Sequence, residues 1–243
     1  MAQLLPARQV SYLQRPRPLV FPSEATKPES KAHLDLRTAL YLVLRAAFRD
    51  VMWIGSDQFV YYDAADPARA VAPDIFVRRG GPDEQFASWK TWERGAPELA
   101  VEIISESDFS QGAWEKKLAR YHSVGIEELV RFEPGAAVPL RVWDRVSNDL
   151  IEREVDGDSA PSRVLGLDFL VRGDQLRLAK DADILPTPDE RADFESARAG
   201  AAAEHALAEA ARAGAEAVRA GEQAARAARL RAQLLAAGID PDD

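Results

Sequence analysis

The segment from Asp189 to Ala237 constrains the fold most, because it is dominated by alanine, glutamate and arginine and offers few large apolar side chains to a core. An arginine or a histidine recurs every seven residues, at Arg198, His205, Arg212, Arg219 and Arg226. This spacing predicts one long helix of imperfect heptads with a seam of alanine. Three glycines lie within it, Gly200, Gly214 and Gly221. Each weakens the helix by about 1 kcal/mol relative to alanine.

Two arrangements of this helix remain open, a solvated single helix and a weak coiled coil that pairs two copies of the chain. We expect the closing LLAAGIDPDD to be a helix end that docks on another surface. At the other end, prolines without periodicity predict an extended arm over residues 1–31. The expected organisation is therefore an arm (1–31), a folded domain (32–188) and a helical tail (189–243).

Composition limits the chemistry that is available to the domain. The chain contains no cysteine, which excludes disulfides, thiolate metal sites and a cysteine nucleophile and fits a reducing compartment. Its three histidines share no zinc-ligand spacing. A bound metal would need oxygen ligands, which favours Mg²⁺ or Mn²⁺.

Charge and hydropathy limit the partners. No run of residues is apolar and long enough to span a membrane, and the N-terminus lacks the apolar core of a signal peptide. We therefore expect a cytoplasmic protein without a membrane span. The formal net charge of −9 argues against an avid, sequence-blind binder of nucleic acid, so a nucleic-acid enzyme would have to gather its positive charge locally.

The pattern along residues 32–188 predicts a sheet with helices. Helical spacing begins at His33 and continues to Phe48. Short apolar runs then predict strands at DVMWIG, QFVYYDAA, IFVRR and ELAVEII, a helix follows at GAWEKKLARYHSVG, and ELVRFEP predicts another strand. Later runs, LRVWDR, LIEREV and VLGLDFLVRGDQLRL, predict strands that extend or cover the sheet. The expected fold class is α/β in the wider sense, or α+β, with a mixed central sheet flanked by helices.

Two carboxylates occupy positions in these strands that favour burial. Asp74 follows Pro73 directly before IFV, and Glu102 lies inside LAVEII. A buried carboxylate is costly unless it is paired, hydrogen-bonded or bound to a cation, and two of them on neighbouring strands make a cation site. Taken singly, Asp74 also fits a turn at a strand end, and Glu102 fits an edge-strand ion pair with an arginine.

The order of these features resembles a known family. VYYDAADPARAVAPDIFV, ELAVEIISESD and KLARYHSVGIEELVRFEP are similar to the Uma-type "putative restriction endonuclease" family, a branch of the PD-(D/E)XK nuclease superfamily. The resemblance runs from about Pro28 to Arg191, and the Ala-Arg-Glu tail is similar to tails often found on these proteins. It implies a restriction-endonuclease-like core.

The resemblance also assigns site residues. Asp74 and Glu102 match the family's metal-binding acids, and the backbone carbonyl of Ile103 would complete the protein ligands. Ile104 stands where the superfamily motif has a lysine, and Lys117 on the following helix matches the position to which this family moves that lysine. Lys116 is a competing candidate, but on a helix it points about 100° away from Lys117.

Other residues are less specific candidates. Glu29 and His33 match an ExxxH pattern on the family's first helix, although a helix cap and a surface histidine explain them equally well. Three basic residues, Arg78, Lys116 and Arg120, are candidate DNA contacts. Nearby tryptophans, Trp89, Trp92 and Trp114, fit either stacking on splayed bases or packing in the core.

The function that the resemblance implies is a Mg²⁺- or Mn²⁺-dependent endonuclease acting on DNA. A homodimer through the C-terminal helix is one of the two arrangements that the heptads leave open. A nuclease fold that only binds or regulates, and a hydrolase of another phosphoester, are the competing hypotheses. The acidic net charge favours the binding module, whereas the complete set of Asp74, Glu102 and Lys117 favours catalysis.

Overall fold

The structure is a computed structural model that describes residues 19–21, 30–104, 112–155 and 157–238. The chain divides into two compact units, Met1–Pro188 and Asp189–Asp243. Within the described residues the helices are α1 (Lys31–Phe48), α2 (Thr91–Arg94), α3 (Ala113–Val124) and α4 (Pro188–Ala236). The search for membrane-spanning helices among these residues found no helix of sufficient length and apolarity.

The first unit is built on a six-stranded sheet in the order β1-β4-β6-β7-β8-β9. These strands are β1 (Met52–Gly55), β4 (Ile75–Arg79), β6 (Leu99–Ile103), β7 (Glu128–Phe132), β8 (Leu140–Val146) and β9 (Asp149–Arg153). Neighbouring strands are antiparallel except β6 and β7, which are parallel and are joined by α3. The sheet is therefore mixed, and the fold is α+β with flanking helices, as the sequence predicted.

Two smaller sheets complete the unit. One has the order β10-β11-β12-β13, and the other has the order β3-β2-β5. Their strands are β10 (Ser159–Pro161), β11 (Asp168–Arg172), β12 (Gln175–Lys180), β13 (Asp183–Ile184), β2 (Val60–Tyr61), β3 (Ala70–Val71) and β5 (Trp89–Lys90). Of the run QFVYYDAA, only Val60 and Tyr61 are strand, and they lie outside the central sheet.

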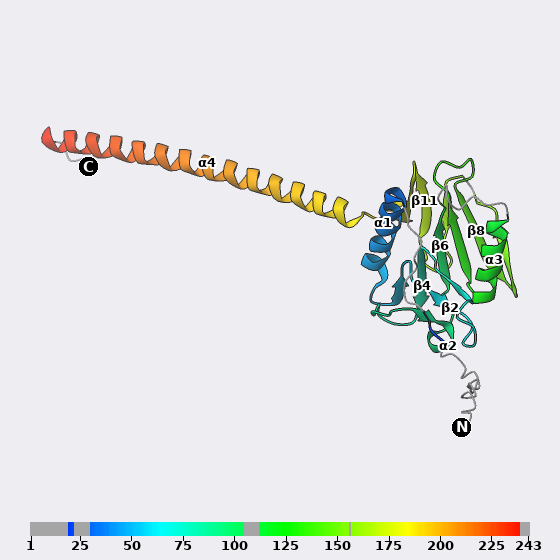
Figure 1. The fold of residues 1–243 in the computed structure, drawn as a ribbon. Coiled ribbons are helices and arrows are strands. Elements are labelled where there is room, and N and C mark those ends of the chain that lie inside the picture. The colour runs from blue at the N-terminus through cyan, green and yellow to red at the C-terminus, as the bar shows by residue number, and fades with distance from the viewer. Residues whose placement is uncertain (1–18, 22–29, 105–111, 156, 239–243) are drawn as a thin grey trace, which may run out of the picture. The chain divides into compact units, whose positions relative to one another are not determined.

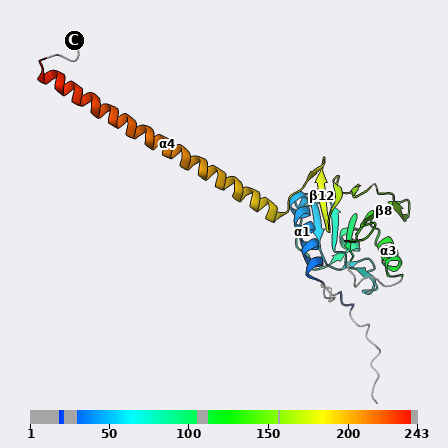
Figure 2. The same ribbon diagram turned by 90° about the horizontal axis from the view of Figure 1, so that it is seen from above.

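The alternation of side chains along β6 separates two cores. Leu99, Val101 and Ile103 point into one core, which is closed by α1 and by the sheet of β10 to β13. Ala100 points into the other, which is closed by α3. Figures 1 and 2 show α1 and α3 on opposite faces of the central sheet. Because side chains alternate along a strand, Glu102 points to the same face as Ala100, toward α3.

The N-cap residue Ser30 determines where α1 begins. The Ser30 hydroxyl accepts a hydrogen bond from the His33 backbone N–H at 3.2 Å, so Lys31 is the first helical residue. Lys31 belongs to the expected arm, so the helix starts one residue inside it. Of the rest of that arm the structure describes only residues 19–21 and Ser30, and the ring of Phe21 packs edge-on against Tyr61, with ring centroids 4.9 Å apart.

The second unit is the long helix that the heptad spacing predicted. α4 runs from Pro188 to Ala236, and every residue from Arg191 onward in it is exposed. The described part of the closing segment, Leu234 to Gly238, is exposed as well, and residues 239–243 lie outside the described residues. Whether α4 pairs with a second copy stays a prediction.

Candidate metal and phosphodiester site

Asp74 and Glu102 lie opposite each other at the ends of two neighbouring strands. β4 and β6 pair antiparallel with Ile75 opposite Val101, so the register continued by one residue places Asp74 opposite Glu102. Glu102 is 2% exposed and lies in the last part of β6. Asp74 precedes β4 and is only partly exposed. Two carboxylates that are far apart in the sequence therefore meet at one end of the sheet.

Asp74 is held from three sides. Its Oδ1 lies 2.6 Å from Nε2 of His33 on α1, and its Oδ2 accepts a hydrogen bond from the Ile103 backbone N–H at 2.6 Å. The hydroxyl of Ser56 donates to the Asp74 carbonyl at 2.9 Å. Arg37 in turn donates to the Ser56 oxygen at 3.0 Å. This network fixes the direction of the carboxylate while its charge stays close to Glu102.

Glu102 is bound by α3. Lys117 Nζ donates to its Oε2 at 2.5 Å, and the Tyr121 hydroxyl donates to its Oε1. Lys117 and Tyr121 are one turn apart and share a face of the helix, whereas Lys116 is exposed. The structure thus places Lys117, the lysine that the resemblance favoured, against Glu102, and Lys116 on another side of the helix.

Burial dominates the electrostatics of Glu102. Burial, assisted by the negative charge of Asp74 and opposed by Lys117 and Tyr121, raises the pKa of the carboxyl from 4.5 to about 7. The pKa of the Tyr121 hydroxyl is raised well above its usual value by its own burial and by Glu102. The charged form of Glu102 is therefore costly in the protein without a further cation.

The residues that are present fit a hard divalent cation. Asp74 lies close enough to Glu102 to raise its pKa, and the Lys117 ammonium contacts Glu102. In a strand, the N–H and the C=O of one residue point toward the same neighbouring strand. The Ile103 carbonyl therefore points toward Asp74, as its N–H does. Oxygen donors of this kind suit Mg²⁺ or Mn²⁺. Among the described residues, no group of three or more His, Cys, Asp and Glu side chains gathers as a metal cluster.

Some candidates are not brought to this site. Arg78 lies four residues along β4 from Asp74, about 13 Å away at 3.3 Å per residue. Its Nη1 donates to Glu98 at 2.5 Å and to the Ala96 carbonyl at 3.1 Å. Arg78 therefore lies away from the two carboxylates, and its assignment as a DNA contact stays a prediction.

The remaining candidates differ in position. Lys116 and Arg120 lie on the exposed side of α3, next to the face that carries Lys117. Trp89 is fully buried and belongs to the core, whereas Trp92 is 42% exposed. Glu29 lies outside the described residues. Ser56 and Arg37 were missed, and no local pattern marks them, because only the tertiary fold brings them to Asp74.

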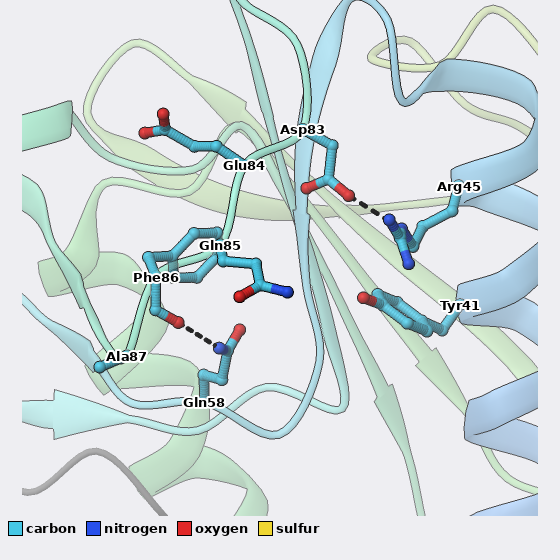
Figure 3. Close-up of a pocket in the computed structure, with 8 residues that line it drawn as sticks. All are labelled: Tyr41, Arg45, Gln58, Asp83, Glu84, Gln85, Phe86 and Ala87. Atoms are coloured by element: carbon cyan, nitrogen blue, oxygen red, sulfur yellow. Dashed lines mark hydrogen bonds and ion pairs between the residues drawn. The ribbon is translucent and has the colours of Figure 1, made fainter.

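A separate pocket of about 500 Å³ lies between α1 and the segment from Asp83 to Ala87. Figure 3 shows the Tyr41 hydroxyl and the amides of Gln58 and Gln85 pointing into it, and Asp83 paired with Arg45 at 2.8 Å. None of Asp74, Glu102 and Lys117 lines it. The pocket is therefore distinct from the carboxylate site.

The chain is similar to known proteins in sequence and in fold. The model of the Uma2 family, described as "Putative restriction endonuclease", matches residues 23–177. A solved structure, described as a "putative nuclease belonging to DUF820" from Anabaena variabilis, is 14% identical, with a TM-score of 0.42 over 58% of this chain and 78% of that chain. No curated protein matches the chain.

Proposed function

The chain belongs to the Uma2 family of restriction-endonuclease-like proteins, and we propose that it is an endonuclease that hydrolyses DNA phosphodiester bonds with Mg²⁺ or Mn²⁺. The observation that carries the proposal is the buried carboxylate of Glu102, which lies opposite Asp74 and is bound by Lys117. Buried carboxyls with a raised pKa and a charged partner are typical of functional sites.

Asp74, Glu102 and the Ile103 carbonyl are the proposed ligands of the metal. When bound, the cation would neutralise charge on the phosphoryl oxygens and lower the pKa of a nearby water. His33 and the Ile103 N–H orient Asp74, and Tyr121 orients Glu102, so the carboxylates need little rearrangement to receive a ligand.

Lys117 is the proposed catalytic cation. The attack of water forms a new P–O bond, breaks the bond to the leaving strand and increases the charge on the phosphoryl oxygens. The Lys117 ammonium can donate a hydrogen bond to one of these phosphoryl oxygens or to the attacking water. Its hydrogen bond to Glu102 fixes its position, and its side chain remains 36% exposed, so a substrate can reach it.

DNA is the proposed partner, and Lys116 and Arg120 are the proposed phosphate contacts beside Lys117. Their exposure supports this assignment, since surface cations contribute most of the sequence-independent affinity for nucleic acid. The net charge of −9 favours the competing proposal, a nuclease fold that binds without cutting.

The experiment is a supercoiled-plasmid nicking assay with Asp74→Asn, Glu102→Gln and a matched control, Glu98→Gln. Glu98 is a buried carboxylate at the opposite end of β6, where it binds Arg78. We expect metal-dependent nicking to be lost in the first two variants and retained in the control. Nicking retained in Asp74→Asn and Glu102→Gln contradicts the proposed site.

We also propose that α4 pairs two copies of the chain. The exposure of α4 from Arg191 onward and its heptads support this, with alanine at Ala199, Ala206, Ala213, Ala220 and Ala227. Equilibrium sedimentation of the full chain and of a chain ending at Pro188 tests it, with a dimer expected for the first and a monomer for the second.

A further inference from the structure

Arg131 lies beside Glu102 on the neighbouring strand. β6 and β7 are parallel, with Glu102 opposite Arg131, and both side chains point to the face that α3 covers. Adjacent strands are about 4.8 Å apart, so Arg131 is within one strand spacing of the proposed metal ligand. Arg131 is not the counter-ion of Glu102, because Lys117 and Tyr121 bind the two oxygens of that carboxylate.

The guanidinium is held in a fixed place. Its central carbon lies 4.8 Å from the ring centroid of Trp114, and its Nη2 donates to Glu133, just beyond β7. Trp114 precedes Lys117 by three residues, which is nearly one helical turn. Stacking on an aromatic ring orients the planar fork of an arginine in advance, so less entropy is lost when it binds an anion.

Not every hydrogen-bond donor of the Arg131 guanidinium has an acceptor. In the part of the chain that the structure describes, the buried Nε of Arg131 and the buried indole N–H of Trp114 have no hydrogen-bond partner. An unmatched buried donor is unfavourable. The side chain as a whole is 13% exposed, so part of it, apart from the buried Nε, reaches the surface.

Arg141 provides the contrast. It lies opposite Arg131 on β8 and stacks over Trp143 at 5.2 Å. Its Nε and Nη2 both donate to the carboxylate of Glu152 at 2.7 Å, so this fork is occupied. Two arginines on one face of the sheet thus have similar stacking, and they differ in whether the donors of the fork are used.

We propose that Arg131 is a positioning residue that binds a phosphate oxygen of the nucleic acid next to the bond that is cut. This inference rests on the proposed function and adds to it the residue that holds the substrate beside Asp74 and Glu102. A guanidinium fork matches the oxygens of a phosphodiester, and a partly desolvated donor binds an anion more strongly than an exposed one. The positive charge also offsets the repulsion between the two carboxylates and the substrate.

The test is the affinity of the full chain for a labelled duplex oligonucleotide, measured by fluorescence anisotropy from low to high salt, with Ca²⁺ in place of Mg²⁺. We expect Arg131→Gln to weaken binding about tenfold, because a charge-assisted hydrogen bond is lost. The slope of log affinity against log salt should fall by about 0.9, the value for one phosphate contact on duplex DNA. The matched control Arg141→Gln should leave the slope unchanged.

A second variant covers the case in which Arg131→Gln does not fold. Arg131→Lys keeps the charge and the aliphatic stem over Trp114 but loses the fork, so it should keep the salt slope and lose affinity. Unchanged affinity in Arg131→Lys, or equal slopes in Arg131→Gln and Arg141→Gln, overturns the inference. If the wild type binds and nicks DNA in those cases, the proposed function stands. A wild type without affinity for DNA overturns both.

Discussion

Replacing Glu102 with glutamine changes how the stability of the metal-free protein depends on pH. In the folded chain, burial and Asp74 hold the pKa of this carboxyl at about 7, against 4.5 in an exposed chain. The folded state therefore binds the Glu102 proton more tightly than the unfolded state does. Between the two pKa values the unfolded state loses that proton first, so the wild type becomes less stable as pH rises.

The size of the effect follows from the interval between the two pKa values. An interval from 4.5 to about 7, at 1.36 kcal/mol for each pH unit, corresponds to about 3 kcal/mol in the free energy of unfolding. This stability is fully present below pH 4.5 and is lost by about pH 7. Glutamine does not titrate and can still accept the hydrogen bond of Tyr121, so Glu102→Gln should lack this loss and be the more stable protein at pH 8.

The assay is denaturant unfolding in a chelating buffer at a series of pH values from 5 to 8. All five tryptophans, from Trp53 to Trp143, lie in the first unit, so tryptophan fluorescence reports its unfolding without a signal from α4. The difference in unfolding free energy between Glu102→Gln and the wild type should grow with pH. Parallel profiles of the two proteins would refute the reasoning, since Glu102 would then have the same pKa in the folded and unfolded states.

Three further predictions concern the central sheet that carries the site and the tail helix α4. Gly55→Ala should cost about 2 kcal/mol of stability in denaturant unfolding, because the added Cβ would lie 2.1 Å from the buried ring of Phe76. Arg78→Leu should cost about 2 kcal/mol, because it leaves the buried Glu98 without its main partner, and it should leave metal binding unchanged in calorimetry. Gly214→Ala should raise the thermal stability of α4, followed by circular dichroism, by about 1 kcal/mol, because φ there is helical and the new Cβ meets open space.

The juxtaposition of Asp74 and Glu102 was predictable because the two occur together, in the order that the resemblance to the family matches. A glutamate inside an apolar strand and an aspartate directly before another need a cation or a hydrogen-bond network, and the structure brings Asp74 and Glu102 into register. Helical periodicity separated Lys117 from Lys116 for a similarly local reason. The long tail helix also follows from local sequence, because no tertiary packing overrides its heptads.

What the sequence could not supply is the pairing of strands. The run QFVYYDAA predicts a strand, but nothing local shows that Val60 and Tyr61 join β3 and β5 instead of the central sheet. The same limit hid the pairing of Arg78 with Glu98 at the other end of β4. It also hid Arg131, since ELVRF shows one arginine in a strand, and only the β6–β7 register places it next to Glu102.

The central claim is that Asp74 and Glu102 form a metal site, and isothermal titration calorimetry of Mg²⁺ and Mn²⁺ into the wild type and Asp74→Asn tests it most directly. We predict saturable binding of a metal ion to the wild type and loss of that binding in Asp74→Asn, whose folded state is checked by tryptophan fluorescence. Equal binding in the two proteins, or no binding in the wild type, would contradict the claim and leave the two carboxylates with a structural role.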